Sequence, residues 1–260
     1  MKRRSYKILT DQMANPKTAK AAKGDDYLTA ILHLAPYDLS GRQVCPFASK
    51  GCAAACLNTA GRGGIGGPDN AIQRRRIKRT LMFREDRERF WDLLISDLIK
   101  LSVEAAKEGM RPAVRLNGTS DIPWERIKVR GFDNIMSMFP GMVFYDYTKY
   151  PINKRTRIPA NYDLTFSRSE ANHDEVIKSL EGGRRVAVVF STKKGQDLPT
   201  QYLGRPVVDG DLHDMRFLDD KAVIVGLRAK GNGKNDNSGF VVEITSEIMV
   251  DSLIYGAIKQ

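Results

Sequence analysis

The sequence predicts an α/β fold, and the favoured architecture is a (β/α) barrel of the TIM type, incomplete or distorted. The 260 residues, 42% of them apolar, suffice for one large core. From Tyr27 onward, short apolar runs rich in β-branched and aromatic residues alternate with helical stretches. Polar and ionisable residues follow six of these runs directly. Because the carboxyl ends of parallel strands meet at one edge, this alternation predicts a shared ligand-binding mouth. An open doubly wound sheet is the alternative.

The individual elements follow from these patterns. Strands are expected at 27–34, 113–116, 142–145, 163–166, 185–190, 206–208 and 222–227. Helices are expected at 70–83, 86–108, 124–130 and 173–180. In the second helix, Phe90, Leu94, Leu98 and Leu101 recur at helical spacing, which indicates a core-facing stripe.

The chain is expected to form one catalytic domain. Residues 1–26 are polar and basic and are predicted to be an arm, residues 27–260 the domain, and 41–69 a cysteine-containing insertion within it. No apolar run reaches membrane-spanning length, and the amino terminus has no apolar signal region, so we expect a cytoplasmic protein with no membrane partner.

Cys45, Cys52 and Cys56 are the only cysteines, and six and three residues separate them. An odd count without an export signal favours reduced thiols or metal ligands over disulfides. Zinc would need a fourth ligand, which could be His33, His213, another side chain or an exogenous molecule; His33 is the nearest histidine in sequence. The alternatives are a [4Fe–4S] cluster with one open iron, or small buried residues in an alanine-rich helix.

A formal net charge of +11 and a pI near 9.6 favour a polyanionic partner, and DNA is the expected one. The basic run opens the helix at 70–83, although a solvated helix face is the plainer interpretation. A glycine-rich loop before it could cradle an anion with its amides, or could be a linker. The predicted phosphate-binding residues are Arg62, Arg74, Arg75, Arg76, Lys78, Arg79 and Lys230.

Three aspartates lie at or just after predicted strands, namely Asp121, Asp146 and Asp209, and Lys149 follows the second of them. At a barrel mouth such carboxylates could act as nucleophiles or general acids and bases. Helix capping, rim packing and a solvated turn are the structural alternatives.

The segments CPFASKGCAAACLNTAGRGG, RLNGTSDIPWE, FYDYTK and VVDGDLHDMRFLD resemble a family of phage-encoded proteins. Through it the chain resembles the phage deazaguanine DNA transglycosylases, relatives of the tRNA-guanine transglycosylases. The resemblance implies a barrel in which an aspartate attacks the anomeric carbon and guanine is exchanged for a deazapurine base. It also implies a structural zinc held by three cysteines and a histidine.

The chain also resembles radical S-adenosylmethionine enzymes, whose cluster cysteines follow the first barrel strand as Cys45 to Cys56 do here. The gaps between the cysteines differ from the usual ones of that group. The first resemblance leads us to expect a DNA transglycosylase with zinc. The alternatives are an iron–sulfur enzyme that uses S-adenosylmethionine and a non-catalytic, zinc-stapled nucleic-acid-binding protein.

Overall fold

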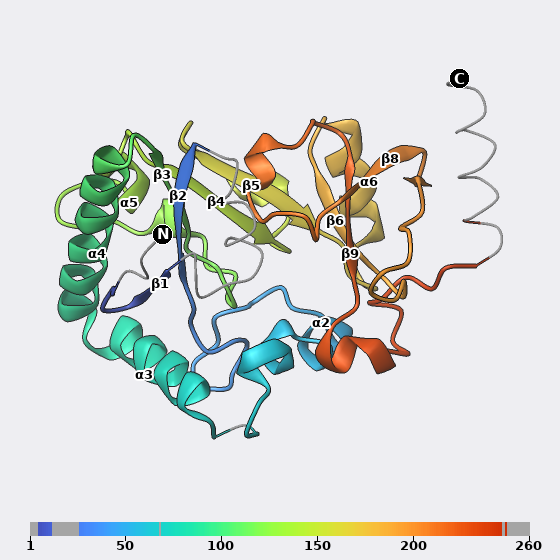
Figure 1. Cartoon of the computed structure of the whole chain (residues 1–260), viewed down its shortest axis with the longest axis horizontal. Helices are drawn as coiled ribbons and strands as arrows, with labels where there is room; N and C mark the ends of the chain where they lie inside the picture. The colour runs from blue at the N-terminus through green and yellow to red at the C-terminus, as the bar shows by residue number, and fades with distance from the viewer. Residues whose placement is uncertain (1–4, 12–25, 68, 246–247, 249–260) are drawn as a thin grey trace.

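The computed structural model describes residues 5–11, 26–67, 69–245 and 248, which form a mixed α/β fold around a nine-stranded, mostly parallel sheet (Figure 1). The strands are β1 (Leu9–Asp11), β2 (Tyr27–Leu32), β3 (Arg111–Arg115), β4 (Val143–Thr148), β5 (Tyr162–Ser167), β6 (Val186–Phe190), β7 (Gln201–Tyr202), β8 (Arg205–Asp209) and β9 (Ile224–Arg228). The α-helices are α2 (Lys50–Ala54), α3 (Ala71–Glu85), α4 (Arg87–Lys107), α5 (Ile135–Met138) and α6 (His173–Glu181). Short 3-10 turns are η2 (Leu57–Thr59), η3 (Gly61–Gly63), η4 (Trp124–Arg126), η5 (Ile152–Lys154), η6 (Arg216–Leu218) and η7 (Gly231–Asn235).

The strand order is β1-β2-β3-β4-β5-β6-β9-β8-β7. Strands β2 to β6 and then β9 and β8 pair in parallel, while β1 and β7 add antiparallel edges. From β2 to β6 each strand lies beside the next in sequence, as in a barrel, and the order does not reverse there as in a doubly wound sheet. Pairing among the described strands does not close the sheet, so the structure confirms the α/β class but not a TIM barrel.

Helices α4 and α6 pack on the sheet, while α2 and α3 lie at the carboxyl ends of its parallel strands (Figure 1). Helix α4 packs on β2 and β3, and α6 packs on β5 and β6 (Figure 1). The apolar stripe predicted for α4 is buried: Phe90, Leu94, Leu98 and Leu101 are all fully inaccessible. They join Trp124 and the β2–β4 side chains in one core, which fixes the ends of those strands. No helix in the described ranges is long and apolar enough to cross a membrane.

Part of the predicted arm belongs to the fold. Strand β1 pairs with β2, with Leu9 opposite Leu32. Asp97, a charged residue inside the apolar stripe of α4, accepts hydrogen bonds from the backbone N–H groups of Ile8 and Leu9 at 2.7 and 3.0 Å. The arm prediction is therefore wrong for residues 9–11, because a buried carboxylate fastens this segment to the core. Residues 1–4 and 12–25 lie outside the described residues.

Two other predictions need correction. The helix expected at 124–130 is only the turn η4, and β4 continues past the predicted end at 145 to Thr148. Asp146 therefore lies within a strand rather than after it. The strand can contain this carboxylate because buried donors from β3 and β5 satisfy it, as described below.

Candidate functional site

The cysteine segment, residues 45–56, lies at the carboxyl ends of the parallel strands, where α2 runs beneath the sheet in Figure 1. Cys45 Sγ lies 3.9 Å from the carbonyl oxygen of Thr119, in the loop after β3. Glu170, in the loop after β5, accepts a hydrogen bond from Gly51 N at 2.7 Å. Because β4 separates β3 from β5, the segment spans several strand ends.

Helix α2 is held tightly against these loops. Ser49 caps it by accepting a hydrogen bond from Cys52 N at 3.2 Å, and the Ser49 hydroxyl donates to Glu170 at 2.7 Å. Gly51 is required here, because a Cβ atom at this position would clash with Ser238 in the loop after β9. The sequence KGC thus sets a close approach that positions Cys52.

The three cysteines are not joined in disulfides, and their thiols are partly buried and close enough to influence one another electrostatically. Burial raises the pKa of Cys45 to about 12, although the N–H of Tyr37 donates to its sulfur at 3.3 Å. Burial also raises the pKa of Cys56, opposed by a hydrogen bond from the Asn58 backbone N–H. A bound cation would reverse this balance and favour the thiolates, so the group is chemically suited to metal or cluster ligation.

A buried and a half-buried cation, Arg76 and Lys149, lie beside the thiols. Arg76 on α3 donates to the side chain of Asn58, and both Arg76 and Lys149 act electrostatically on Cys56. Lys149 follows β4, and its ammonium donates to Ser167 Oγ at 2.9 Å. Neither cation has a carboxylate ion-pair partner among the residues whose placement is described. A buried cation without a carboxylate partner, as Arg76 is, favours a negatively charged occupant nearby.

His33, the predicted fourth zinc ligand, lies after β2 with its Nδ1 atom packed toward Gly118 and without a hydrogen-bond partner in the described part of the chain. Burial lowers its pKa strongly, as do the charges of Arg76, Arg79 and Arg115. These neighbours hold the imidazole neutral. The described residues contain no three His, Cys, Asp or Glu side chains arranged to hold one metal ion.

Asp146 supports the loop that follows β3. It accepts hydrogen bonds from Asn117 N at 2.6 Å and from the Tyr162 hydroxyl at 2.7 Å, and burial raises its pKa to about 7. Asn117 in turn accepts from Ile122 N and Trp124 Nε1, each at 3.0 Å. Both carboxylate oxygens are engaged within the core, so the geometry gives Asp146 a positioning role.

Asp121 ends this supported loop and reaches the surface of a cavity. Its carboxylate accepts from Thr148 Oγ1 at 2.7 Å and Lys149 N at 2.8 Å, its N–H donates to Val44 O at 2.9 Å, and its charge acts on Cys45. Burial raises the pKa of Asp121. Of the three predicted aspartates, this one combines contact with the cysteine segment and access to a cavity.

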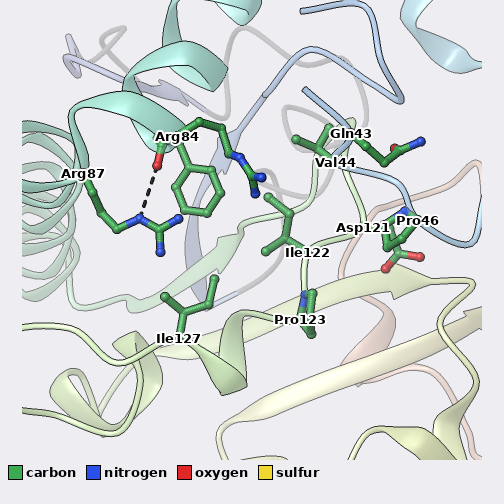
Figure 2. Close-up of a pocket in the computed structure, with 10 residues that line it drawn as sticks. Gln43, Val44, Pro46, Arg84, Arg87, Asp121, Ile122, Pro123 and Ile127 are labelled. Atoms are coloured by element: carbon green, nitrogen blue, oxygen red, sulfur yellow. Dashed lines mark hydrogen bonds between the residues drawn. The ribbon is translucent and has the colours of Figure 1, made fainter. Parts of the chain in front are cut away.

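The cavity, of about 220 Å³, lies between the end of α3 and the loop after β3 (Figure 2). Its lining residues are Gln43, Val44, Pro46, Phe83, Arg84, Arg87, Asp121, Ile122, Pro123 and Ile127.

Asp209 lies elsewhere. It ends β8 and pairs with Arg228 at 2.8 Å, while its neighbour Asp211 pairs with Lys230 at 2.6 Å. None of the contacts recorded for the described residues links Asp209 to Asp121 or Asp146. The three predicted catalytic aspartates therefore do not form one group, because β8 lies near the far edge of the sheet.

The predicted phosphate-binding residues lie in different environments, some buried or paired and some exposed. Arg76 is buried, and Arg79 is half-buried with a weak hydrogen bond to His33 O at 3.4 Å. Lys230 is engaged by Asp211. The side chain of Arg62 lies outside the described residues. The cations that α3 exposes to solvent within the run are Arg74, Arg75 and Lys78.

Sequence reasoning did not predict Glu170 and Asn58 as site residues, and it named Arg84 and Arg87 only as an extension of the basic run. Glu170 stands in the polar group after β5, so its place was readable from the chain. The others needed the structure, because their roles depend on how α3 packs against the cysteine segment and the loop after β3.

No curated protein and no solved structure matches this chain. A family model described as Gene product 88 matches residues 7–244, which include every described strand, the three cysteines and Asp121. The chain therefore belongs to the Gene product 88 family.

Proposed function

We propose that this protein is an iron–sulfur enzyme that uses S-adenosylmethionine, with Cys45, Cys52 and Cys56 as the cluster ligands. The observation that carries the proposal is the meeting of three thiols at the carboxyl edge of a parallel sheet, beside the buried Arg76 and the half-buried Lys149. Ligands of parallel α/β folds bind at this edge.

A donor set of three thiols is typical of a cluster with one open iron. Zinc would need a fourth ligand beside the three cysteines. In a four-iron cluster each thiolate binds a different iron, so the sulfurs stand farther apart and three cysteines leave one iron open. When bound, such a cluster supplies an electron and an open coordination position for S-adenosylmethionine.

The chain's own residues would orient and compensate the thiolates. Tyr37 N and Asn58 N donate to the sulfurs of Cys45 and Cys56. Arg76 and Lys149 supply positive charge that opposes the negative charge of the ligand set. Hydrogen bonds to sulfur and nearby charge are the main levers by which a protein tunes such a group.

Anaerobic purification followed by iron, sulfide and zinc analysis tests the proposal. We expect about four irons and four sulfides per chain, a brown colour, and a paramagnetic signal after reduction with dithionite. Cys52→Ser should lose most of the iron, while Asp209→Asn, on the distant strand β8, should keep it. Stoichiometric zinc without iron would refute the proposal.

A second candidate function is the exchange of guanine in DNA for a deazaguanine base through Asp121, as a transglycosylase of the phage type. It is favoured by the position of Asp121 on the cavity between two arginines and an apolar wall. Incubation with DNA and deazapurine bases, followed by nucleoside analysis, tests it. Exchanged base that disappears in Asp121→Asn but persists in Asp209→Asn would support this function, whereas unchanged nucleosides with the wild-type protein would exclude it.

A further inference from the structure

The cavity described above joins an apolar interior to a positively charged mouth. Val44, Phe83, Ile122 and Ile127 line its walls, and Asp121 provides a carboxylate at one side. Figure 2 shows the side chains of Arg84 and Arg87 reaching from the end of α3 and the start of α4 toward the same space.

Both arginines are exposed, and neither has an acidic partner among the residues that the structure describes. The guanidinium of Arg87 is placed by Phe83: its Nε donates to Phe83 O at 3.4 Å, and its central carbon lies 4.7 Å from the centre of the Phe83 ring. The nearby acid Glu85 pairs instead with Arg42 at 2.8 Å. Two adjacent uncompensated guanidinium groups form a phosphate-binding arrangement.

We propose that this cavity binds one nucleotide of a single-stranded nucleic acid, with the base against the apolar wall and the phosphate on Arg84 and Arg87. The volume of about 220 Å³ is below the usual range of about 300–1,000 Å³ for drug-sized ligands, which suits a single base. A base face is apolar, and its edge carries N–H groups that can donate to the carboxylate of Asp121 and to the amide oxygen of Gln43.

The surrounding positive charge favours a nucleic-acid strand over a free nucleotide as the ligand. Helix α3 exposes further cations, Arg75 and Lys78, which can contact neighbouring phosphates, and the chain as a whole carries +11. A single-stranded or extruded base is required, since a stacked base pair could not enter a cavity of this size.

The site adjoins the thiol group. Val44 and Pro46 line the cavity while Cys45 between them directs its sulfur toward Tyr37 N and Thr119 O. A single-stranded nucleic acid would thus be the substrate of the proposed enzyme, and this part of the inference rests on the proposed function. Nucleic-acid binding itself needs no cluster, so it can be measured separately.

Fluorescence anisotropy with a short labelled single-stranded DNA, and RNA of the same sequence, tests the site on the full chain. Arg84→Gln with Arg87→Gln should weaken binding about tenfold and lower the slope of log affinity against log salt by about 0.7, because one phosphate contact is lost. Arg89→Gln is the matched control, because Arg89 is exposed on α4 but does not line the cavity. Equal affinities for the double variant and the control would overturn the proposal.

Ile127→Trp tests the base subsite, because the indole would fill the cavity while leaving both arginines. It should weaken oligonucleotide binding and leave binding of inorganic polyphosphate unchanged; unchanged oligonucleotide binding would refute entry of the base. Thermal melting confirms that each variant is folded, and Arg84→Gln and Arg87→Gln are measured singly if the pair unfolds, each being expected to weaken binding relative to Arg89→Gln. If an equimolar free mononucleotide fully displaced the labelled oligonucleotide, a nucleic-acid strand would be refuted as the preferred ligand.

Iron analysis of the same samples separates the two proposals. Oligonucleotide binding with zinc in place of iron would refute the cluster but support this site. A loaded cluster with no difference between the double variant and Arg89→Gln would support the cluster and refute this site.

Discussion

Replacing Arg76 with glutamine removes a buried positive charge beside Cys56 while keeping an amide that can donate to Asn58. Arg76 is 8% exposed, burial lowers its pKa, and no carboxylate pairs with it among the described residues. Its charge acts on Cys56, and also on His33 and Arg79. If the three thiolates carry a cluster, Arg76 stabilises the more negative, reduced form.

The magnitude follows from Coulomb's law. At an effective dielectric constant of about 20, two unit charges separated by on the order of 8 Å interact by about 2 kcal/mol. For a one-electron couple this equals about 90 mV. We therefore expect Arg76→Gln to lower the midpoint potential of the cluster by about 90 mV in an anaerobic spectroelectrochemical titration.

Arg75→Gln is the matched control, since it removes the same charge from the exposed neighbour on α3. Solvent and salt screen that charge, so its shift should stay below about 20 mV. Equal shifts in the two variants, or no shift in Arg76→Gln, would refute the view that the buried guanidinium compensates the thiolates.

Three further predictions concern the scaffold of the site. Asp146→Ala leaves the buried donors of Asn117 and Tyr162 unpaired and should lower the free energy of unfolding by about 3 kcal/mol in urea titrations; a loss below about 1 kcal/mol would contradict this. Burial raises the pKa of Asp146 from 3.8 to about 7, so the folded state binds the proton of this carboxyl more tightly than the unfolded state does. The free energy of unfolding should therefore fall as the pH rises from about 4 to about 7. In thermal melts, Asp146→Asn should flatten this dependence on pH. Gly51→Ala should displace α2 and reduce iron content, whereas Gly141→Ala, which meets no atom within 4 Å, should not; equal iron content in both would refute the close-packing argument.

The element pattern was predictable because strands and helices with strong periodicity carry their own signal. The parallel strands and the long helices α3 and α4 occur where alternation and the apolar stripe placed them. Asp97 shows the limit of such reasoning. A lone acid in an apolar stripe is consistent with a helix, but its partners are the backbone amides of Ile8 and Leu9 at the start of β1, some ninety positions away, which no local pattern can indicate.

Strand β4 shows a second limit. A carboxylate ordinarily ends a buried strand, so sequence reasoning stopped the strand before Asp146. The strand continues because Asn117 from the β3 loop and Tyr162 from β5 satisfy that carboxylate. The correct boundary depended on tertiary hydrogen bonds, and so did the difference between a catalytic and a positioning aspartate.

The basic run contains both buried and exposed arginines for a related reason. Consecutive arginines on a helix must point in different directions, since successive residues are rotated by about 100°. Arg76 therefore faces the cysteine segment while Arg75 faces solvent. One stretch of sequence thereby serves two tasks, charge compensation at the thiols and attraction of a polyanion. The two candidate functions share the second task, so nucleic-acid binding at the cavity would leave both open, and the metal content would decide between them.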